Sequence, residues 1–190
     1  ALDQLLAPVM KILGDRPFHI AVTGSGGKLA GSRHGFAVIN EFAAIAEAAQ
    51  LLYPATRTII EMGGETSKFI RLERNENLGR LGIADYGTNG DCAAGTGAFM
   101  DQQALRLKFR IEDVGDIVMK ASKAAQIAGR CSVFAKSDMI HAQQRGYRPD
   151  EVLKGLCNAV SRNFKNAVAR SRKVVPPALF IGGVSLNVGM

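Results

Sequence analysis

The sequence has no tryptophan, only three cysteines and no long apolar run. Three cysteines in 190 residues cannot build a disulfide framework. No apolar stretch approaches the ~20 residues that a transmembrane helix needs. The N-terminal residues 1–13 carry Asp3 and Lys11 and do not resemble a secretory signal. No strand interleaves aromatic with basic residues, as RNA-binding strands do. These absences predict a cytoplasmic protein that binds neither a membrane nor nucleic acid.

The composition is that of an ordinary globular protein, with 47% hydrophobic and 22% charged residues. A chain of 190 residues suits one domain or slightly more. The formal charge of +7 suits an anionic ligand or an acidic partner protein.

The order of apolar patterns predicts alternating helices and strands. Apolar residues three and four positions apart indicate helices, and short apolar runs that end in turn residues indicate strands. The predicted helices cover residues 2–13, 36–52, 97–108, 112–122, 132–145 and 149–171. The predicted strands cover residues 18–23, 58–62, 67–72, 79–88 and 178–181.

Three predicted strands run directly into glycines, at residues 24–27, 63–64 and 182–183. Glycine lets backbone N–H groups approach a phosphate closely. Glu61 and Glu65 flank the second pair, and a carboxylate there can hold Mg²⁺ or its waters. A tight turn with no ligand explains each glycine pair equally well.

Cys92 and Cys131 occupy matched settings, because each follows a small or turn-forming residue and leads into a predicted helix. A helix start stabilises a thiolate through its unpaired N–H groups and its dipole. Two cysteines per chain become four across a two-fold axis. Four thiolates suit a [4Fe–4S] cluster or a zinc ion equally well. The remaining alternative is that both are buried structural residues.

The third cysteine, Cys157, has a different setting. It shares one helical stripe with Leu153, Val160 and Phe164. We therefore expect Cys157 to pack in the core.

Taken together, four stretches of this sequence resemble one protein family. They are Glu-Met-Gly-Gly-Glu at 61–65, Cys-Ala-Ala-Gly-Thr-Gly at 92–97, Cys-Ser-Val-Phe-Ala at 131–135 and Gly-Gly-Val-Ser-Leu-Asn at 182–187. The family comprises the ATP-dependent activators of 2-hydroxyacyl-CoA dehydratases and the related ATPase subunits of benzoyl-CoA reductases. The resemblance implies an α/β fold of the actin, Hsp70 and sugar-kinase (ribonuclease H-like) superfamily.

The resemblance also assigns roles to individual residues. It implies that Cys92 and Cys131 ligate one [4Fe–4S] cluster shared by two subunits, so that the chain forms a homodimer. It implies that Glu61 and Glu65 serve Mg²⁺ and the attacking water. The residues that it places around ATP or ADP are Gly63 and Gly64 at a phosphate hairpin, Gly95, Thr96 and Gly97 at a helix start, and Gly182 and Gly183 at the adenosine turn.

The function that the resemblance implies is that of an ATP-dependent, low-potential one-electron donor. Its partners would be a 2-hydroxyacyl-CoA dehydratase or related iron–sulfur reductase, with reduced ferredoxin or flavodoxin as the electron source. The alternatives are a non-redox nucleotide-binding switch or assembly module, and a small-molecule kinase of the same superfamily.

The sequence also departs from the family pattern. The family has Asp at the position of Glu61, Gln-Asp at Glu65-Thr66, and an acid at Lys136. No Asp-x-Gly phosphate hairpin precedes Phe18, and the family pattern continues beyond Met190. We therefore expect residues 1–190 to be a partial ATPase domain, mostly one lobe plus part of the other. Such a chain would hydrolyse ATP poorly by itself.

Overall fold

The computed structural model describes residues 2–14, 16–76, 79–90, 96–128 and 132–190. The chain divides into two compact units, residues 1–45 and 46–190. Within the described ranges, no helix combines the length and the apolar character needed to cross a membrane.

The first unit contains two helices and a short parallel strand pair. Its elements are α1 (Leu2–Leu13), β1 (Ala21–Val22), α2 (Gly27–His34), β2 (Ala37–Val38) and the start of α3 (Glu41–Leu52). The predicted strand 18–23 is reduced to two residues, and α2 was not predicted because residues 27–34 carry no apolar stripe. The predicted helix 36–52 begins at Glu41, because Asn40 Oδ1 accepts hydrogen bonds from the next backbone N–H groups.

The second unit is built on a four-stranded sheet. Its strands are β3 (Thr58–Met62), β4 (Ser67–Asn75), β5 (Arg80–Thr88) and β6 (Ala178–Ile181). The spatial order is β5-β4-β3-β6, in which β3, β4 and β5 are antiparallel and β6 runs parallel to β3. The four strands predicted for this part of the sequence are confirmed, with β4 three residues longer than expected.

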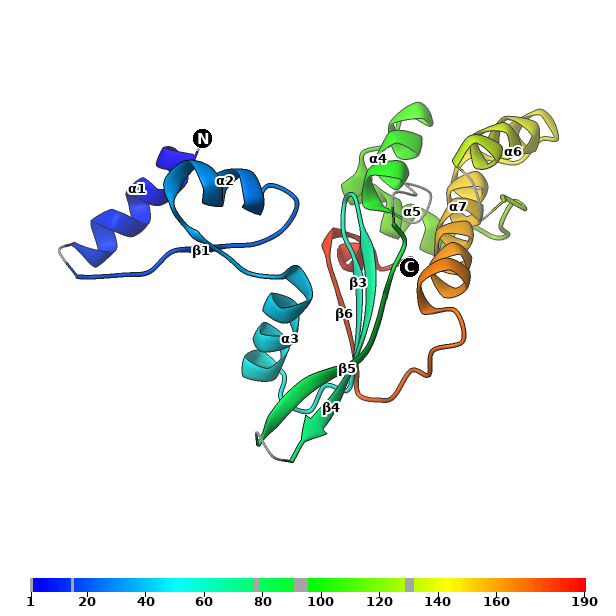
Figure 1. Cartoon of the computed structure of the whole chain (residues 1–190). Coiled ribbons are helices and arrows are strands. Elements are labelled where there is room, and N and C mark those ends of the chain that lie inside the picture. Colours follow the sequence, from blue (N-terminus) through cyan, green and yellow to red (C-terminus); the bar gives the residue numbers. More distant parts are fainter. Residues whose placement is uncertain (1, 15, 77–78, 91–95, 129–131) are drawn as a thin grey trace. The chain divides into compact units, whose positions relative to one another are not determined.

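Helices cover one face of this sheet (Figure 1). They are α4 (Gly97–Arg106), α5 (Val114–Lys120), α6 (Ser132–Gln144) and α7 (Pro149–Asn163). Short 3₁₀ helices, η2 (Ile111–Asp113) and η4 (Gly183–Leu186), precede α5 and follow β6, and a π-helical segment, η3 (Phe164–Ala169), extends α7. The predicted helices of this unit are confirmed, with differences at their ends.

The core lies between the sheet and these helices. Phe69 and Met62 point from the sheet into a cluster that includes Phe99 of α4 and Val160 of α7. Each such side chain contributes about 1.5–3 kcal/mol when it is fully buried. Cys157 belongs to this cluster and is only 2% exposed, which confirms its predicted place in the core.

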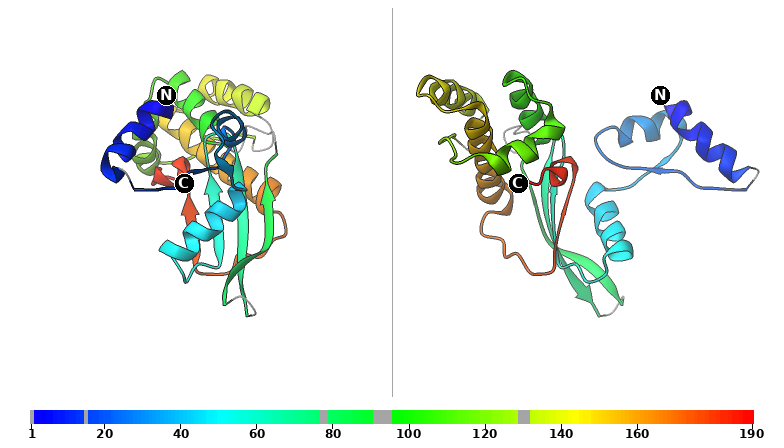
Figure 2. Two further views of the ribbon diagram at one scale, coloured as in Figure 1. Left: turned by 60° about the vertical axis from the view of Figure 1, so that its left-hand side comes forward. Right: turned by 180° about the vertical axis from the view of Figure 1, so that it is seen from behind.

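The opposite face of the sheet is also buried. Ile59, Ile70 and Leu72 are almost fully covered there, and the second half of α3 lies on this side (Figure 2). Gln50 of α3 accepts a hydrogen bond from the Leu81 N–H of β5. Both faces of the sheet are therefore covered along β3 and the first part of β4, whereas Ile83 and Tyr86 of β5 remain exposed.

Candidate functional site

The turn between β3 and β4 is attached to the start of α4 by backbone hydrogen bonds. Within the turn, the Gly63 N–H donates to the Thr66 carbonyl at 2.9 Å. The Gly63 and Gly64 carbonyls accept hydrogen bonds from the N–H groups of Gly97 and Ala98, at 2.8 and 2.9 Å. The first amides of α4 are therefore used to hold the turn, and the turn and the helix start form one continuous backbone surface.

Two glycines make this close approach possible. A Cβ atom on Gly63 would lie 2.6 Å from Glu61 Oε1 and 3.1 Å from the Thr66 carbonyl oxygen. A Cβ atom on Gly97 would lie 3.1 Å from Val184 Cγ2. Side chains at these positions would crowd Glu61, Thr66 or Val184, so glycine allows the turn and the helix start to pack this closely.

The turn after β6 approaches the same region from another part of the sequence. Gly182 has φ of 92°, and a Cβ atom there would collide with the Met62 carbonyl of β3. Ser185 donates two hydrogen bonds to the Gly182 carbonyl, from its N–H at 3.0 Å and its hydroxyl at 2.7 Å. The neighbouring Gly183 has open space around its Cβ position.

These turns border a cavity of about 470 Å³ between α4, η2 and η4. Gly63, Gly64, Gly97 and Gly183 line it. The rest of the wall is mainly apolar, with Met100, Ile111, Val184 and Leu186, and two carboxylates, Asp101 and Glu112. A cavity of this size and character suits a small organic ligand, because apolar walls bury the ligand and backbone groups orient it.

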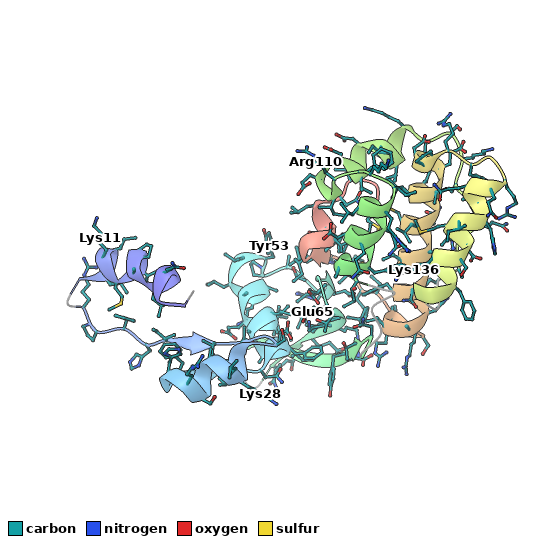
Figure 3. The ribbon with its side chains drawn as sticks, turned by 90° about the horizontal axis from the view of Figure 1, so that it is seen from above. Lys11, Lys28, Tyr53, Glu65, Arg110 and Lys136 are labelled. Carbon is teal, nitrogen blue, oxygen red and sulfur yellow. The ribbon has the colours of Figure 1, made fainter. Side chains whose placement is uncertain are left out.

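One charged pair stands beside the cavity. Arg110 donates to both carboxylate oxygens of Asp113 in η2, at 2.9 and 3.0 Å, and Figure 3 labels Arg110. The hydrogen bonds from Arg110 lower the pKa of the Asp113 carboxyl. Asp113 therefore remains an anion down to lower pH than an ordinary aspartate does.

The two predicted acidic residues lie in different surroundings. Glu61 is 12% exposed and forms an ion pair with Lys68 at 3.1 Å. Glu65 is exposed in the β3–β4 turn (Figure 3). Among the residues that the structure describes, no three His, Cys, Asp or Glu side chains gather as a metal site would require.

The structure brings together most of the glycines that the sequence singled out. Gly63, Gly64, Gly97 and Gly183 line one cavity, and Gly182 stands directly before it. Thr96 is 1% exposed and precedes α4 in an extended conformation. Gly95, Cys92 and Cys131 lie outside the described residues.

Residues 127 and 128, which precede the second cysteine in the sequence, are held by two helices. Asp138 of α6 accepts a hydrogen bond from the Ala128 N–H at 2.8 Å. Arg162 of α7 donates to the Ile127 carbonyl at 2.7 Å. Lys136, where the family pattern has an acid, lies on α6 (Figure 3). Sequence reasoning missed Asp138 and Arg162, because each acts on a backbone group that no motif identifies.

Residues 13–190 match the model of the BadF/BadG/BcrA/BcrD ATPase family. The protein YjiL of Escherichia coli is 38% identical over 137 residues, which is 72% of this chain and 51% of YjiL. The 2-hydroxyisocaproyl-CoA dehydratase activator of Clostridioides difficile is 32% identical over 155 residues, which is 80% of this chain and 55% of the activator.

Solved structures give the same result. The crystallised activator of the 2-hydroxyisocaproyl-CoA dehydratase from Clostridium difficile, with bound ADPNP, matches with a TM-score of 0.83 and 27% identity. That match covers 99% of this chain and 67% of the activator. Structural likeness to such proteins confirms the predicted α/β fold of the actin and Hsp70 type. The chain spans about half the length of the curated relatives it matches.

Proposed function

The chain belongs to the BadF/BadG/BcrA/BcrD ATPase family, and on this premise we propose that it serves a cytoplasmic, ATP-dependent activator. The activator passes single low-potential electrons to a 2-hydroxyacyl-CoA dehydratase or a related reductase. Membership confirms the resemblance found in the sequence. Relatives named as dehydratase activators and as a benzoyl-CoA reductase subunit support the proposed role. The chain matches about half of each of these, so the proposal concerns the whole protein.

The observation that carries this proposal is the meeting of separate glycine turns around one cavity. Gly63 and Gly64, Gly97, and Gly183 come from three distant parts of the sequence. Phosphates would lie on the cavity side of the turn, where Gly64 has open space at its Cβ position and Gly63 and Gly97 carry no side chain of their own. The nucleoside would lie between the apolar side chains of η2 and η4.

Two acids flank the turn, Glu61 near the end of β3 and Glu65 in the turn itself, and Glu65 is the better placed to act on Mg²⁺ or on the attacking water. Glu65 is exposed and can reach a metal-bound water, whereas Glu61 is bound to Lys68. Carboxylates hold Mg²⁺ together with phosphate oxygens and water, so an acid beside a phosphate turn fits such an ion. The two acids therefore do different work.

Cys92 and Cys131, from each of two copies of the chain, would ligate one [4Fe–4S] cluster. Four thiolates are the donor set that such a cluster takes. When bound, the cluster would supply a one-electron carrier, reduced by ferredoxin or flavodoxin. Helix α4 begins five residues after Cys92, and α6 begins directly after Cys131.

Backbone contacts link the phosphate turn to the start of α4, which lies five residues after Cys92 in the sequence. The Gly97 and Ala98 N–H groups hold the Gly63 and Gly64 carbonyls, so a shift of the turn moves the start of α4. The segment before Cys131 is held separately by Asp138 and Arg162. Binding or loss of the terminal phosphate would therefore act first on the Cys92 side.

Nucleotide binding to the intact protein tests the first half of the proposal. Gly64→Asp places a carboxylate in open space beside the cavity, so it repels phosphates without a clash in the fold. We expect calorimetry to show about tenfold weaker ATP binding or more, which is ~1.4 kcal/mol. Gly82→Asp in β5 adds the same charge in open space away from the cavity and leaves the affinity unchanged. Equal affinities in both variants would contradict the assignment of the turn.

Anaerobic purification with iron and sulfide counts tests the second half. We expect about four irons per two chains, and their loss in Cys92→Ser and Cys131→Ser. Cys157→Ala is the matched control. This variant should retain the iron, because Cys157 lies in the core. A colourless protein that holds zinc, or no metal after reconstitution, would favour the nucleotide-binding switch or the kinase instead.

A further inference from the structure

The pairing of β3 with β4 places a charged pair at the end of a buried apolar row. Glu61 stands opposite Lys68 in the antiparallel ladder, two residues beyond the pair Ile59 and Ile70. Residues two apart on a strand share one face. Glu61 and Lys68 therefore continue the row formed by Ile59 and Ile70, up to the turn that borders the cavity.

Lys68 is buried deeply for a lysine. Its side chain is only 3% exposed, and an ammonium group removed from water is stable only when charged or polar partners surround it. The Lys68 Nζ atom lies 3.1 Å from Glu61 Oε2 and 2.7 Å from Thr66 Oγ1. One cation therefore joins the acid at the end of β3 to the last residue of the turn.

The same contacts fix the position of the Glu61 carboxylate. Its Oε2 atom faces Lys68, and its Oε1 atom lies where a Cβ atom on Gly63 would be only 2.6 Å away. The Glu61 carboxylate therefore lies between the backbone of the turn at Gly63 and the ammonium group of Lys68. A movement of Lys68 would release both Glu61 and Thr66.

We propose that Lys68 is a positioning residue that holds the β3–β4 turn in its phosphate-binding shape and keeps Glu61 from coordinating a metal ion directly. The inference rests on the proposed nucleotide function. It deepens that function by dividing the work between the two acids. Lys68 is the resident cation that balances Glu61. Exposed Glu65 is the acid that serves Mg²⁺ or its waters.

The physical reason is the free energy needed to separate the buried Lys68 and Glu61 side chains. Direct coordination of Mg²⁺ by Glu61 would draw its carboxylate away from Lys68. The ammonium group would then lose the Glu61 carboxylate while remaining covered by protein, which is unfavourable. A metal ion held by phosphate oxygens and water beside exposed Glu65 leaves the Lys68–Glu61 pair in place.

The first test is a double-mutant cycle on the thermal stability of the intact protein without nucleotide. Lys68→Met leaves the Glu61 charge buried, and Glu61→Gln leaves the Lys68 charge buried. The double variant has neither charge. We expect each single variant to lower Tm clearly, and the double variant to be more stable than the sum of the two predicts. The coupling should correspond to a tenfold or larger change in the unfolding equilibrium. Additive effects of the two substitutions would overturn the proposed positioning role of Lys68.

The second test measures the ratio of ATP affinities with Mg²⁺ and with EDTA. Glu65→Gln should reduce this ratio several-fold, whereas Glu61→Gln should leave it within about twofold of the wild-type ratio. Loss of the Mg²⁺ dependence in Glu61→Gln alone would overturn the proposal, because it would make Glu61 the metal ligand.

Thr66 provides a readout that does not break the ion pair. Thr66→Val removes the hydroxyl group that Lys68 contacts, at nearly constant shape, and should weaken ATP binding about three- to tenfold while lowering Tm less than Lys68→Met does. Thr66→Ser keeps the hydroxyl and should bind ATP almost as the wild type does. Unchanged ATP affinity in Thr66→Val would argue that the contact between Lys68 and Thr66 does not hold the turn in its phosphate-binding shape.

The outcomes separate this inference from the proposed function. If the wild-type protein binds no nucleotide, the proposed function fails. The double-mutant cycle without nucleotide still decides whether Lys68 holds the turn in place. If nucleotide binds and the cycle shows no coupling, the proposed function stands and the role of Lys68 is refuted.

Discussion

The two glycine turns that border the cavity are held in place by different means. The turn after β3 is held by polar groups, namely the Lys68 contacts to Glu61 and Thr66 and the backbone hydrogen bonds from α4. The turn after β6 is held by close backbone packing, because Gly182 has φ of 92° and lies against the Met62 carbonyl. The first turn thus depends on charge and the second on shape.

The surroundings of the two turns differ in the same way. Beyond the second turn, Asn187 is half-buried and its Oδ1 atom accepts a hydrogen bond from the Gly189 N–H, while Cys157 of α7 lies in the apolar core. The first turn ends in exposed Glu65 and partly exposed Thr66. A turn fixed by shape can hold a nucleoside in one position, whereas a turn fixed by ionic contacts can respond to the charge of a phosphate.

The largest expected effect comes from Gly182→Ala. A Cβ atom there forces a non-glycine residue to positive φ, which costs about 1–2 kcal/mol, and it collides with the Met62 carbonyl. Overpacking of this kind costs a further ~1–3 kcal/mol. We expect urea unfolding to show a loss of about 3 kcal/mol.

Gly183→Ala is the matched control for this variant. The adjacent position has open space around its Cβ and no positive φ. The expected change in the free energy of unfolding is within about 0.5 kcal/mol. Similar losses in both variants would mean that backbone shape does not hold the second turn.

The strands of the sheet could be predicted from the sequence because short apolar runs end in glycines. Residues 58–62 and 178–181 were found with their observed bounds. Helix α2 could not be found, because residues 27–34 contain glycine, lysine and serine without an apolar stripe. Its formation depends on packing within the first unit, which a local pattern does not contain.

The site was predictable as a set of turns but not as an arrangement. The glycine pairs at 63–64 and 182–183 were visible in the sequence, whereas the hydrogen bonds from Gly97 and Ala98 depend on how α4 packs. The role of Lys68 was missed, although the sequence held a signal for it. In a hairpin that turns at residues 63–66, Glu61 and Lys68 must stand opposite each other.

A second prediction concerns the buried thiol of Cys157 in α7. Burial raises the pKa of the Cys157 thiol to about 11, although its contact with Asn187 lowers the pKa in part. The unfolded thiol ionises near pH 9, so the folded chain holds this proton more tightly between pH 9 and 11. Stability from this group is therefore complete below pH 9 and declines as pH rises through 11, by about 2.7 kcal/mol at most.

Unfolding measured at several pH values in the wild type and in Cys157→Ala isolates this effect. The variant starts from lower stability, because it loses buried sulfur contacts. Its stability should decline less steeply above pH 9, because it lacks the buried thiol. The lysines and tyrosines titrate in both proteins and do not contribute to the difference. Parallel pH profiles would show that burial does not hold the Cys157 proton more tightly in the folded chain.

The smallest expected effect is that of Gly63→Ala in the first turn. The nearest atom to the new Cβ is Glu61 Oε1 at 2.6 Å, at the end of a side chain that can give way by a few tenths of an ångström. We expect a loss of about 1 kcal/mol in the free energy of unfolding. Gly64→Ala meets nothing within 4 Å and should cost less than about 0.5 kcal/mol. Adding Lys68→Met to Gly63→Ala frees the carboxylate to move away from the new methyl group. The methyl group should then cost less than it does beside Lys68, and an unchanged cost would mean that the ion pair does not fix the turn.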